Sequence, residues 1–268
     1  MVDVEGHQRE RQFHDEWANA IDPHQVPVLE TFNASTSPEA RWLAASMGCL
    51  AGKRILELGS GAGEGAVYFA LQGAQVTATD LSAGMLDVVK RVAALHGVTV
   101  ETKLCSAEDL SIFPEASFDL VYAGNLLHHA NIARCLDQVK RVLKTGGLAC
   151  FYDPVAHNPL VNIYRRMATK VRTEDEHPIR RQDLRLFQER FQKINKKFFW
   201  FTTLLIFVRF YLIDRVHPNQ DRYWKRILVR EPQLRRSYQA LERVDRILLR
   251  LFPFLGWWCW NVAIVVEK

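Results

Sequence analysis

The sequence predicts an α/β protein built on a mostly parallel sheet. Apolar runs of strand length alternate with helical patterns over residues 50–153, which is the order expected when strands are joined by helices. A strand, a glycine-rich turn and a helix follow one another within residues 54–71. With 268 residues the chain can bury a full core, so we expect one large domain, or one domain with a substantial insertion.

The glycine-rich turn predicts a ligand site. Gly59, Gly61 and Gly63 alternate directly after the apolar run 55–58. Glycines accept positive φ and let the backbone approach a ligand closely, and the free N–H groups at the start of the next helix face the same place. A phosphate-binding loop of the Walker type needs a lysine, which this turn lacks. ATP and GTP are therefore not the expected ligands.

Glu57, just before the glycines, favours one kind of cofactor over another. The glycines match the dinucleotide fingerprint weakly in the register Gly61, Gly63 and Ala66, so a nicotinamide-dependent oxidoreductase is an alternative. A carboxylate at this place repels a pyrophosphate, however. It suits a cofactor that carries a positive charge and an amino group.

Further motifs follow this turn in a fixed order. They are Asp80 after the second expected strand, Ala-Glu-x-Leu (107–110), Phe-Asp-Leu-Val (118–121) and Leu-Lys-x-Gly-Gly (143–147). Together with the acid and glycines of the turn they resemble the class I S-adenosylmethionine-dependent methyltransferases, of the small-molecule, methyltransferase-11-like type. The resemblance implies S-adenosylmethionine as cofactor and S-adenosylhomocysteine as product. It also implies a Rossmann-like, seven-stranded sheet whose antiparallel last strand lies between the fifth and sixth.

The resemblance implies which residues bind the cofactor. Asp80 would accept hydrogen bonds from the ribose hydroxyls, and Leu81 would lie against the adenine. Ser106 stands where many members of the family have an aspartate that holds the adenine. The whole set expected at the cofactor is Glu57, Gly59, Ser60, Gly61, Gly63, Asp80, Leu81, Ser106, Ala107, Glu108, Asn125 and Trp17, the last from an N-terminal helix that would cover the cofactor.

Four histidines are candidates for a general base, namely His128, His129, His157 and His177. The first two follow the fourth expected strand, and sites on open parallel sheets lie at that carboxyl edge. In most members of the family such a pair is structural. The third follows the fifth strand, with Asp153 and Asn158 as further substrate contacts, and the fourth lies in a polar loop, 172–178, that would act as a lid. Ordinary solvated loops would have the same composition.

Cysteine use and the N-terminus predict a cytoplasmic protein. The five cysteines are odd in number and include no Cys-x-x-Cys pair, so they indicate neither a zinc site nor a disulfide framework. No metal is expected, since methyl transfer requires none. The N-terminus lacks the apolar region of a secretory signal, and the longest apolar run, 198–208, is too short to span a bilayer.

The two halves of the chain differ in charge. Residues 1–159 contain 12 Lys and Arg against 19 Asp and Glu, whereas residues 160–268 contain 23 against 11, together with five of the seven tryptophans. Such a basic, aromatic part suits the surface of an anionic membrane, an acidic substrate or nucleic acid. A solvated helical face around an aromatic core has the same composition. The protein would be peripheral to a membrane if this part contacts lipid.

Four parts are expected along the chain. These are an N-terminal helical flap (1–48), a Rossmann-like core that binds the cofactor (49–203), a helical insertion or lid (204–256) and the last core strand (257–268). Prolines and arginines between residues 214 and 237 predict only short elements there, followed by an amphipathic helix over 238–251.

The sequence thus predicts a methyltransferase that moves a methyl group by in-line displacement to a small or amphiphilic acceptor, lipid-like or anionic. Nucleic acid is not the expected partner, because no Asn/Asp-Pro-Pro-Tyr type motif or separate RNA-binding module is present. A catalytically silent S-adenosylmethionine-binding protein is a second alternative, beside the oxidoreductase, because Ser106 departs from the family pattern. The sequence leaves open the acceptor atom (oxygen, nitrogen, carbon or sulfur), the base and the oligomeric state.

Overall fold

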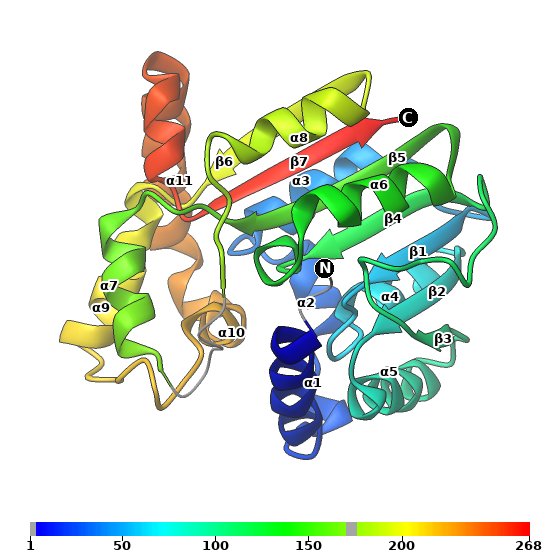
Figure 1. The fold of residues 1–268 in the computed structure, drawn as a ribbon. Coiled ribbons are helices and arrows are strands. Elements are labelled where there is room, and N and C mark those ends of the chain that lie inside the picture. Colours follow the sequence, from blue (N-terminus) through cyan, green and yellow to red (C-terminus); the bar gives the residue numbers. More distant parts are fainter. Residues whose placement is uncertain (1–3, 170–175) are drawn as a thin grey trace.

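In the computed structural model, which describes residues 4–169 and 176–268, seven strands form one sheet with the order β3-β2-β1-β4-β5-β7-β6 (Figure 1). The strands are β1 (Arg54–Leu58), β2 (Gln75–Asp80), β3 (Glu101–Leu104), β4 (Phe118–Gly124), β5 (Leu143–Pro154), β6 (Lys193–Phe199) and β7 (Asn261–Glu267). Strands β1 to β5 pair in parallel, whereas β7 is antiparallel to both β5 and β6. The predicted sheet, with its antiparallel last strand, is confirmed.

Helices cover both faces of this sheet. One face packs against α2 (Val28–Asn33), α3 (Pro38–Met47), α4 (Glu64–Leu71) and α5 (Ala83–Leu95), and the other against α6 (Ile132–Val142) and α8 (Asp183–Arg190). On β1, Ile55 belongs to the first apolar cluster, and Leu56 and Leu58 belong to the second. A parallel strand buried on both faces needs apolar residues on both, and this explains the continuous apolar run before the glycine turn.

The other helices lie on the side where the parallel strands have their carboxyl ends (Figure 1). They are α1 (Val4–Ala18), which packs along α5, and α7 (Pro159–Met167), α9 (Leu205–Leu212), α10 (Tyr223–Val229) and α11 (Glu231–Leu251). Short 3-10 helices connect the elements, namely η1 (Pro23–Gln25), η2 (Leu127–His129), η3 (Thr202–Leu204) and η4 (Pro253–Trp258). None of the described helices combines the length and the apolar character needed to cross a membrane.

Some element boundaries differ from those predicted. Helix α11 begins at Glu231 instead of Tyr238, because Pro232 lies in its first turn, where the missing N–H of proline breaks no helical hydrogen bond. Strand β5 begins at Leu143, the first residue of the Leu-Lys-x-Gly-Gly motif. This residue already pairs with Phe118, before an irregularity in the pairing of β4 with β5. The helices α2 and α7 were not expected.

Asp245, in the middle of α11, attaches this helix to the end of the sheet. Its side chain is 5% exposed and accepts the backbone N–H groups of Phe201, Thr202 and Thr203 at 3.1, 2.6 and 3.3 Å. The hydroxyls of both threonines also donate to it. Asp245 therefore caps η3 from another helix, which fixes the chain where it leaves β6.

Asp245→Ala should lower the free energy of unfolding by about 3 kcal/mol, because it leaves several buried or half-buried donors without an acceptor. Denaturant titration measures this. The matched control is Glu242→Ala on the same helix, where the carboxylate lies 3.9 Å from Nη2 of Arg246 in an i, i+4 pair; it should cost less than about 0.5 kcal/mol. Equal losses in the two variants would contradict the capping role.

Candidate functional site

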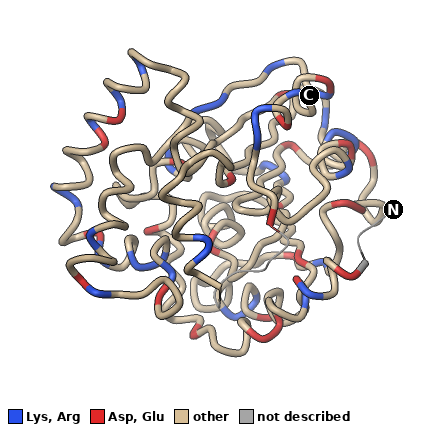
Figure 2. Tube along the Cα trace, turned by 60° about the vertical axis from the view of Figure 1, so that its left-hand side comes forward, with Lys and Arg blue, Asp and Glu red and all other residues tan. Residues whose placement is uncertain are grey.

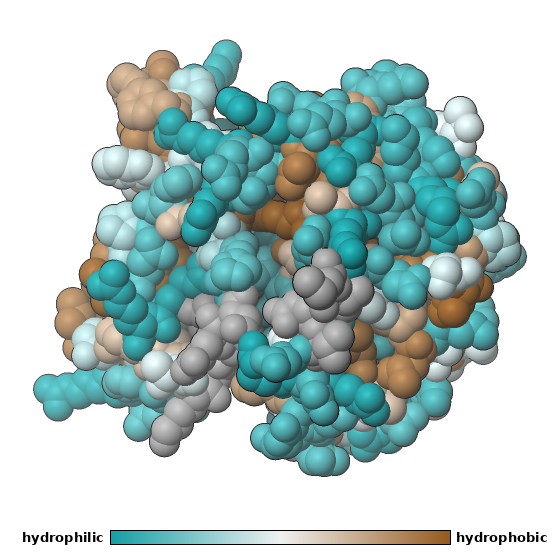
Figure 3. All heavy atoms as spheres, in the orientation of Figure 1, coloured by the Kyte–Doolittle hydropathy of each residue, from teal (hydrophilic) through white to brown (hydrophobic). Residues whose placement is uncertain are grey.

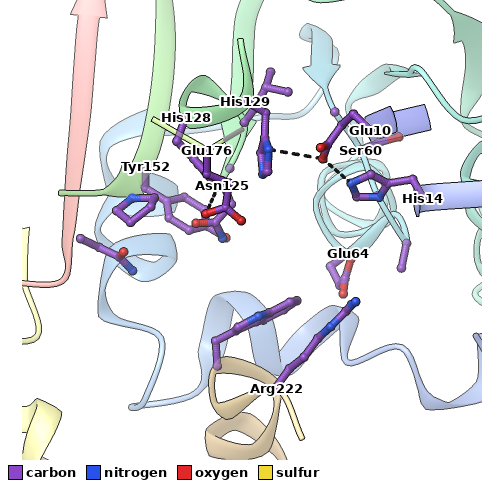
Figure 4. A pocket seen from close by; sticks show the side chains of 18 of the residues that line it. Glu10, His14, Ser60, Glu64, Asn125, His128, His129, Tyr152, Glu176 and Arg222 are labelled. Atoms are coloured by element: carbon purple, nitrogen blue, oxygen red, sulfur yellow. Dashed lines mark hydrogen bonds and ion pairs between the residues drawn. The ribbon is translucent and has the colours of Figure 1, made fainter. Parts of the chain in front are cut away.

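A cavity of about 320 Å³ lies at the carboxyl ends of the parallel strands (Figure 4). This volume is within the range of small-molecule sites. The cavity is bounded by the turn after β1, by the loops after β2 to β5, and by α1, α7 and the start of α10. Its lining includes Glu10, His14, Trp17, Gly59, Ser60, Gly61, Glu64, Asp80, Leu81, Ser106, Ala107, Asn125, His128, His129, Tyr152, Tyr164, Arg165, Glu176, Arg222, Trp224 and Trp260.

The glycine turn forms one wall. Gly59, Gly61 and Gly63 have φ angles of 60°, 51° and 90°, so the prediction of positive φ is confirmed. A Cβ on Gly59 would lie 2.7 Å from Leu126, and one on Gly63 would lie 3.1 Å from Val89. These two glycines therefore serve the packing of the turn. A Cβ on Gly61 would meet nothing within 4 Å, so this is the glycine at which a ligand can approach the backbone.

Two buried polar atoms beside the turn have no hydrogen-bond partner within the described ranges. They are Ser60 Oγ, in the cavity lining, and Glu57 Oε2, in β1. Burial raises the pKa of Glu57 well above its usual range, and the charge of Glu64 adds to this. Gly65 makes room for this carboxyl, since a Cβ there would lie 2.0 Å from Glu57 Oε1. Buried polar atoms normally have partners, so Ser60 Oγ fits a ligand that offers a polar group at the turn. Glu57, expected at the cofactor, is buried beneath the turn and is not part of the cavity lining.

Asp80 lies at the tip of β2 and fixes the turn. Its Oδ2 accepts the N–H of Gly61 at 3.0 Å, and its Oδ1 accepts the N–H of Ser82 at 2.9 Å. Burial raises the pKa of Asp80 although these N–H groups act against it. Leu81 and Ala107 line the cavity near this carboxylate. An acid after the second strand, with apolar residues close by, is the arrangement that receives the ribose and base of a nucleoside.

Glu108, expected at the cofactor, is not part of the cavity lining. Its Oε1 accepts the N–H of Asn131 at 2.8 Å and lies 3.2 Å from Nε2 of His7. It therefore ties α1 and the start of α6 to this loop. Ser106, whose Oγ accepts the N–H of Glu108 at 3.1 Å, does line the cavity, as does Ala107.

Histidines and carboxylates gather at the other end of the cavity. Asp153 Oδ1 lies 2.7 Å from Nδ1 of His128 and also accepts the backbone N–H of that residue. Nε2 of His128 lies 3.9 Å from Glu176 Oε2, and its ring centroid lies 4.0 Å from that of His129. Arg165 donates to Glu176 at 2.8 Å. Asp153, expected as a substrate contact, is instead buried behind His128, and burial raises its pKa to about 8.

Helix α1 covers this end through charged contacts. Glu10 Oε1 lies 3.0 Å from Nε2 of His14 and 3.3 Å from Nδ1 of His129 (Figure 4). Trp17 lines the cavity as expected, but the guanidinium carbon of Arg222 lies 3.5 Å from its ring centroid. Nη1 of Arg222 is buried with no hydrogen-bond partner among the described residues, and burial lowers the pKa of this group to about 10. Arg222 is therefore still a cation at neutral pH.

The other two candidate bases lie outside the cavity. His157 is exposed, because α7 begins two residues later and turns the chain away from the sheet. Asn158, the neighbouring expected contact, caps that helix through its side chain. The backbone N–H of His177 donates to the carbonyl of His128 at 2.6 Å, but its side chain is not in the lining. Residues 172–175 of the expected lid lie outside the described residues.

Asn125 marks the point where β4 opens into the cavity. It has a φ of 54°, which is uncommon for a residue other than glycine and often marks a functional site. Its side-chain amide donates to the hydroxyl oxygen of Tyr152 at 3.2 Å. Burial raises the pKa of Tyr152. Tyr152 was missed in the sequence, although its place at the end of the fifth strand is a usable signal.

A doubly wound sheet with a glycine turn after β1, an acid at the tip of β2 and a cavity at the carboxyl edge defines a nucleoside-binding α/β protein. Comparison with known proteins gives the class. Residues 56–151 match the family described as methyltransferase domain. This part of the chain is therefore a methyltransferase domain of the class I S-adenosylmethionine-dependent family, as predicted, and the cofactor of that family is S-adenosylmethionine.

Curated relatives are similar to this chain over part of its length. Ubiquinone biosynthesis O-methyltransferases of Nitrobacter winogradskyi and Pseudomonas syringae are 33% identical over 106 residues and 32% identical over 116 residues. The matches cover 39% and 43% of this chain and 40% and 50% of the relatives, so the chain spans half or less of their length.

A solved structure shows the same fold. A geranyl diphosphate C-methyltransferase of Streptomyces coelicolor, in complex with Mg²⁺, geranyl diphosphate and S-adenosylhomocysteine, has a TM-score of 0.57 at 16% identity, over 87% of this chain and 79% of that chain.

Glu10→Gln should make the attachment of α1 less sensitive to acid. Burial acts to raise the pKa of Glu10, but its hydrogen bonds to His129 and His14 outweigh burial and hold the pKa far below the usual range. Such a carboxyl stabilises the folded state above its unfolded pKa of about 4.3, and this stabilisation is lost as the pH falls below that value. Hydrogen-exchange protection factors in α1, relative to the sheet, should therefore fall more steeply between about pH 5 and about pH 3 in the wild type than in Glu10→Gln.

The control for this experiment is Glu16→Gln, an exposed position on the same helix. It should keep the acid response of the wild type. A parallel loss of α1 protection in the wild type and in Glu10→Gln would show that Glu10 does not hold the helix.

Proposed function

We propose that this chain transfers the methyl group of S-adenosylmethionine to an oxygen atom of an amphiphilic, anionic small molecule. The observation that carries this proposal is a single cavity with two unlike ends. One end, called the donor end below, has the glycine turn and Asp80. The other, called the acceptor end, has the arginines and aromatic residues of α7 and α10. A donor and an acceptor held in one cavity can react in line, which supplies much of the rate enhancement of a displacement.

The donor end fits S-adenosylmethionine group by group. Asp80 would accept hydrogen bonds from the ribose hydroxyls, with Leu81 and Ala107 against the base. The unpartnered Ser60 Oγ and the open backbone at Gly61 would meet the methionine part. The sulfonium of this cofactor supplies a methyl group that a nucleophile can take directly. The protein therefore has to hold, orient and desolvate the two reactants.

The acceptor end favours an anion with an apolar body. Arg222 offers a buried Nη1 that has no hydrogen-bond partner in the described chain, and guanidinium groups suit carboxylate and phosphate. Tyr152, Tyr164 and Trp224 line the same space and supply aromatic faces for an apolar body. The geranyl diphosphate in the complex of similar fold is a molecule of this type.

Oxygen is the proposed acceptor atom because the relatives of the domain are named O-methyltransferases. In such a transfer the acceptor O–H bond breaks and its proton leaves. The oxygen forms a bond to the methyl carbon while the C–S bond breaks, with its electron pair moving to sulfur. His128 and His129 line the end of the cavity where that proton would leave.

Asp80→Asn should weaken binding of S-adenosylhomocysteine about 10- to 100-fold in calorimetry, because hydrogen bonds to a charged group contribute about 1.5–3 kcal/mol. With S-adenosylmethionine that carries a labelled methyl group and an extract of small molecules, the wild type should give labelled products that mass spectrometry identifies. The variant should give far less product at the same donor concentration.

Asp87→Asn is the matched control, since this aspartate is exposed on α5 next to the site; it should behave as the wild type. The proposal would be overturned if the wild type bound neither S-adenosylmethionine nor its product, or if Asp80→Asn changed nothing. Binding without any labelled product would favour the catalytically silent alternative.

The C-terminal helices also favour contact with an anionic lipid surface, where an amphiphilic acceptor would be found. Large apolar side chains of α11 and η4 are exposed, namely Val244, Ile247, Leu251, Phe252, Phe254 and Trp258. Apolar surface is visible over α7 and α9 and at the tip of α11 (Figure 3). Basic and acidic residues are interspersed over the molecule (Figure 2). The exposed aromatic residues therefore mark this surface better than its charge does.

Replacing Phe254 and Trp258 together by serine should reduce co-sedimentation with phosphatidylserine-containing liposomes about tenfold, because the variant has less apolar surface to bury in the interface. Leu95→Ser, at an exposed leucine of α5, is the control and should bind as the wild type does. Equal sedimentation of both variants, or none by the wild type, would contradict the lipid contact.

A further inference from the structure

We propose that His128, His129 and Glu176 bind a divalent transition-metal ion at the acceptor end of the cavity. One ligand atom from each, a ring nitrogen or a carboxylate oxygen, lies within 4.8 Å of the other two. All three side chains line the cavity (Figure 4). Two imidazoles and one carboxylate form the ligand set of zinc and iron sites that keep a position open for substrate.

Two of the three side chains are oriented by a partner on their other side. Asp153 lies 2.7 Å from Nδ1 of His128, so Nε2 is the ring nitrogen on the side of Glu176. Arg165 donates to Glu176 at 2.8 Å. Metal-binding histidines almost always donate their second N–H to a carboxylate, carbonyl or water, and ligating carboxylates are hydrogen-bonded in turn. The arrangement therefore includes the supporting groups as well as the ligands.

Only a small movement is needed to close the site. Atoms bound to one ion at about 2.0–2.2 Å lie at most about 4.4 Å apart. The spread of up to 4.8 Å between the three ligand atoms is therefore within reach of side-chain rotation. The site uses no cysteine, which is why the cysteine spacing did not predict it. Glu176 also lies far along the chain from the two histidines, so no local motif joins the ligands.

The role of the ion rests on the proposed function. An acceptor hydroxyl bound to the ion, near Asn125 and Tyr152, would be acidified as metal-bound water is. Its proton passes to solvent water. The oxygen then bonds to the methyl carbon while the C–S bond breaks toward sulfur, which yields a methyl ether and S-adenosylhomocysteine. In this scheme His128 is a ligand and not a general base.

Metal binding can be tested on the full chain without an acceptor. Chelator-treated protein titrated with Co²⁺ should develop visible absorption that saturates at one equivalent, and Zn²⁺ should remove it. His129→Gln and Glu176→Gln should each weaken Co²⁺ binding by at least about tenfold. Asp153→Asn, a positioning variant, should weaken it about 10- to 100-fold without removing a ligand. Affinity should fall as the pH drops below about 6.5, because the histidines must be neutral to bind.

His157→Gln and Glu115→Gln change the same residue types at exposed positions and should bind Co²⁺ as the wild type does. The proposal is overturned if the wild type shows no saturable binding, or if the two ligand variants match it.

Calorimetry with S-adenosylhomocysteine on the same preparations keeps the two proposals apart. Binding of this compound without Co²⁺ binding would remove the metal site alone, and the reverse result would remove the proposed function alone. Equal activity of metal-free and loaded enzyme would overturn the acidifying role.

Discussion

The hydrogen bond from the backbone N–H of Gly61 to Asp80 is the constraint on which the cavity depends. It joins the turn after β1 to the tip of β2, so the backbone that faces a ligand and the acid beside it form one rigid unit. Two other glycines near the turn have no space for a side chain, because Gly59 packs against Leu126 and Gly65 against the buried carboxyl of Glu57. The positions of these glycines and of the two buried acids, Glu57 and Asp80, are thus set by one another.

The two ends of the cavity are built in different ways. The donor end consists of short turns at the ends of adjacent parallel strands, and the sheet register alone brings them together. The acceptor end is assembled from α1, α7, α10 and the loop after β4, whose relative positions depend on tertiary contacts such as Glu10 with His129 and Trp17 with Arg222. A fold of this kind can keep its cofactor while the helices change the acceptor.

This difference also explains what the sequence could and could not predict. The sheet, the glycine turn and Asp80 were predictable, because a strand, a turn and a helix are adjacent in the chain and carry local signals. Glu10, Glu176 and Arg222 were not, since each is a charged residue in a polar stretch until tertiary packing brings it to the cavity. Glu108 is expected at the cofactor from its motif, but in the structure it lies outside the cavity lining and contacts His7 and Asn131. Pro232 predicts an interruption in the sequence, whereas in the structure it lies in the first turn of α11.

The contact between Trp17 and Arg222 has a thermodynamic consequence. The indole belongs to α1, which is also attached beside the donor end, where Ser82 and Gly84 donate hydrogen bonds to Asp15. The guanidinium belongs to the wall that faces the acceptor, so this stacked pair lies between the two proposed ligand sites. An acceptor anion that changes how this pair stacks changes the free energy of holding α1 in place. By linkage, the donor must then alter the affinity for the acceptor by the same factor as the acceptor alters the affinity for the donor. Under the proposed function, a donor and an acceptor that both act on this pair would bind cooperatively although they touch different residues.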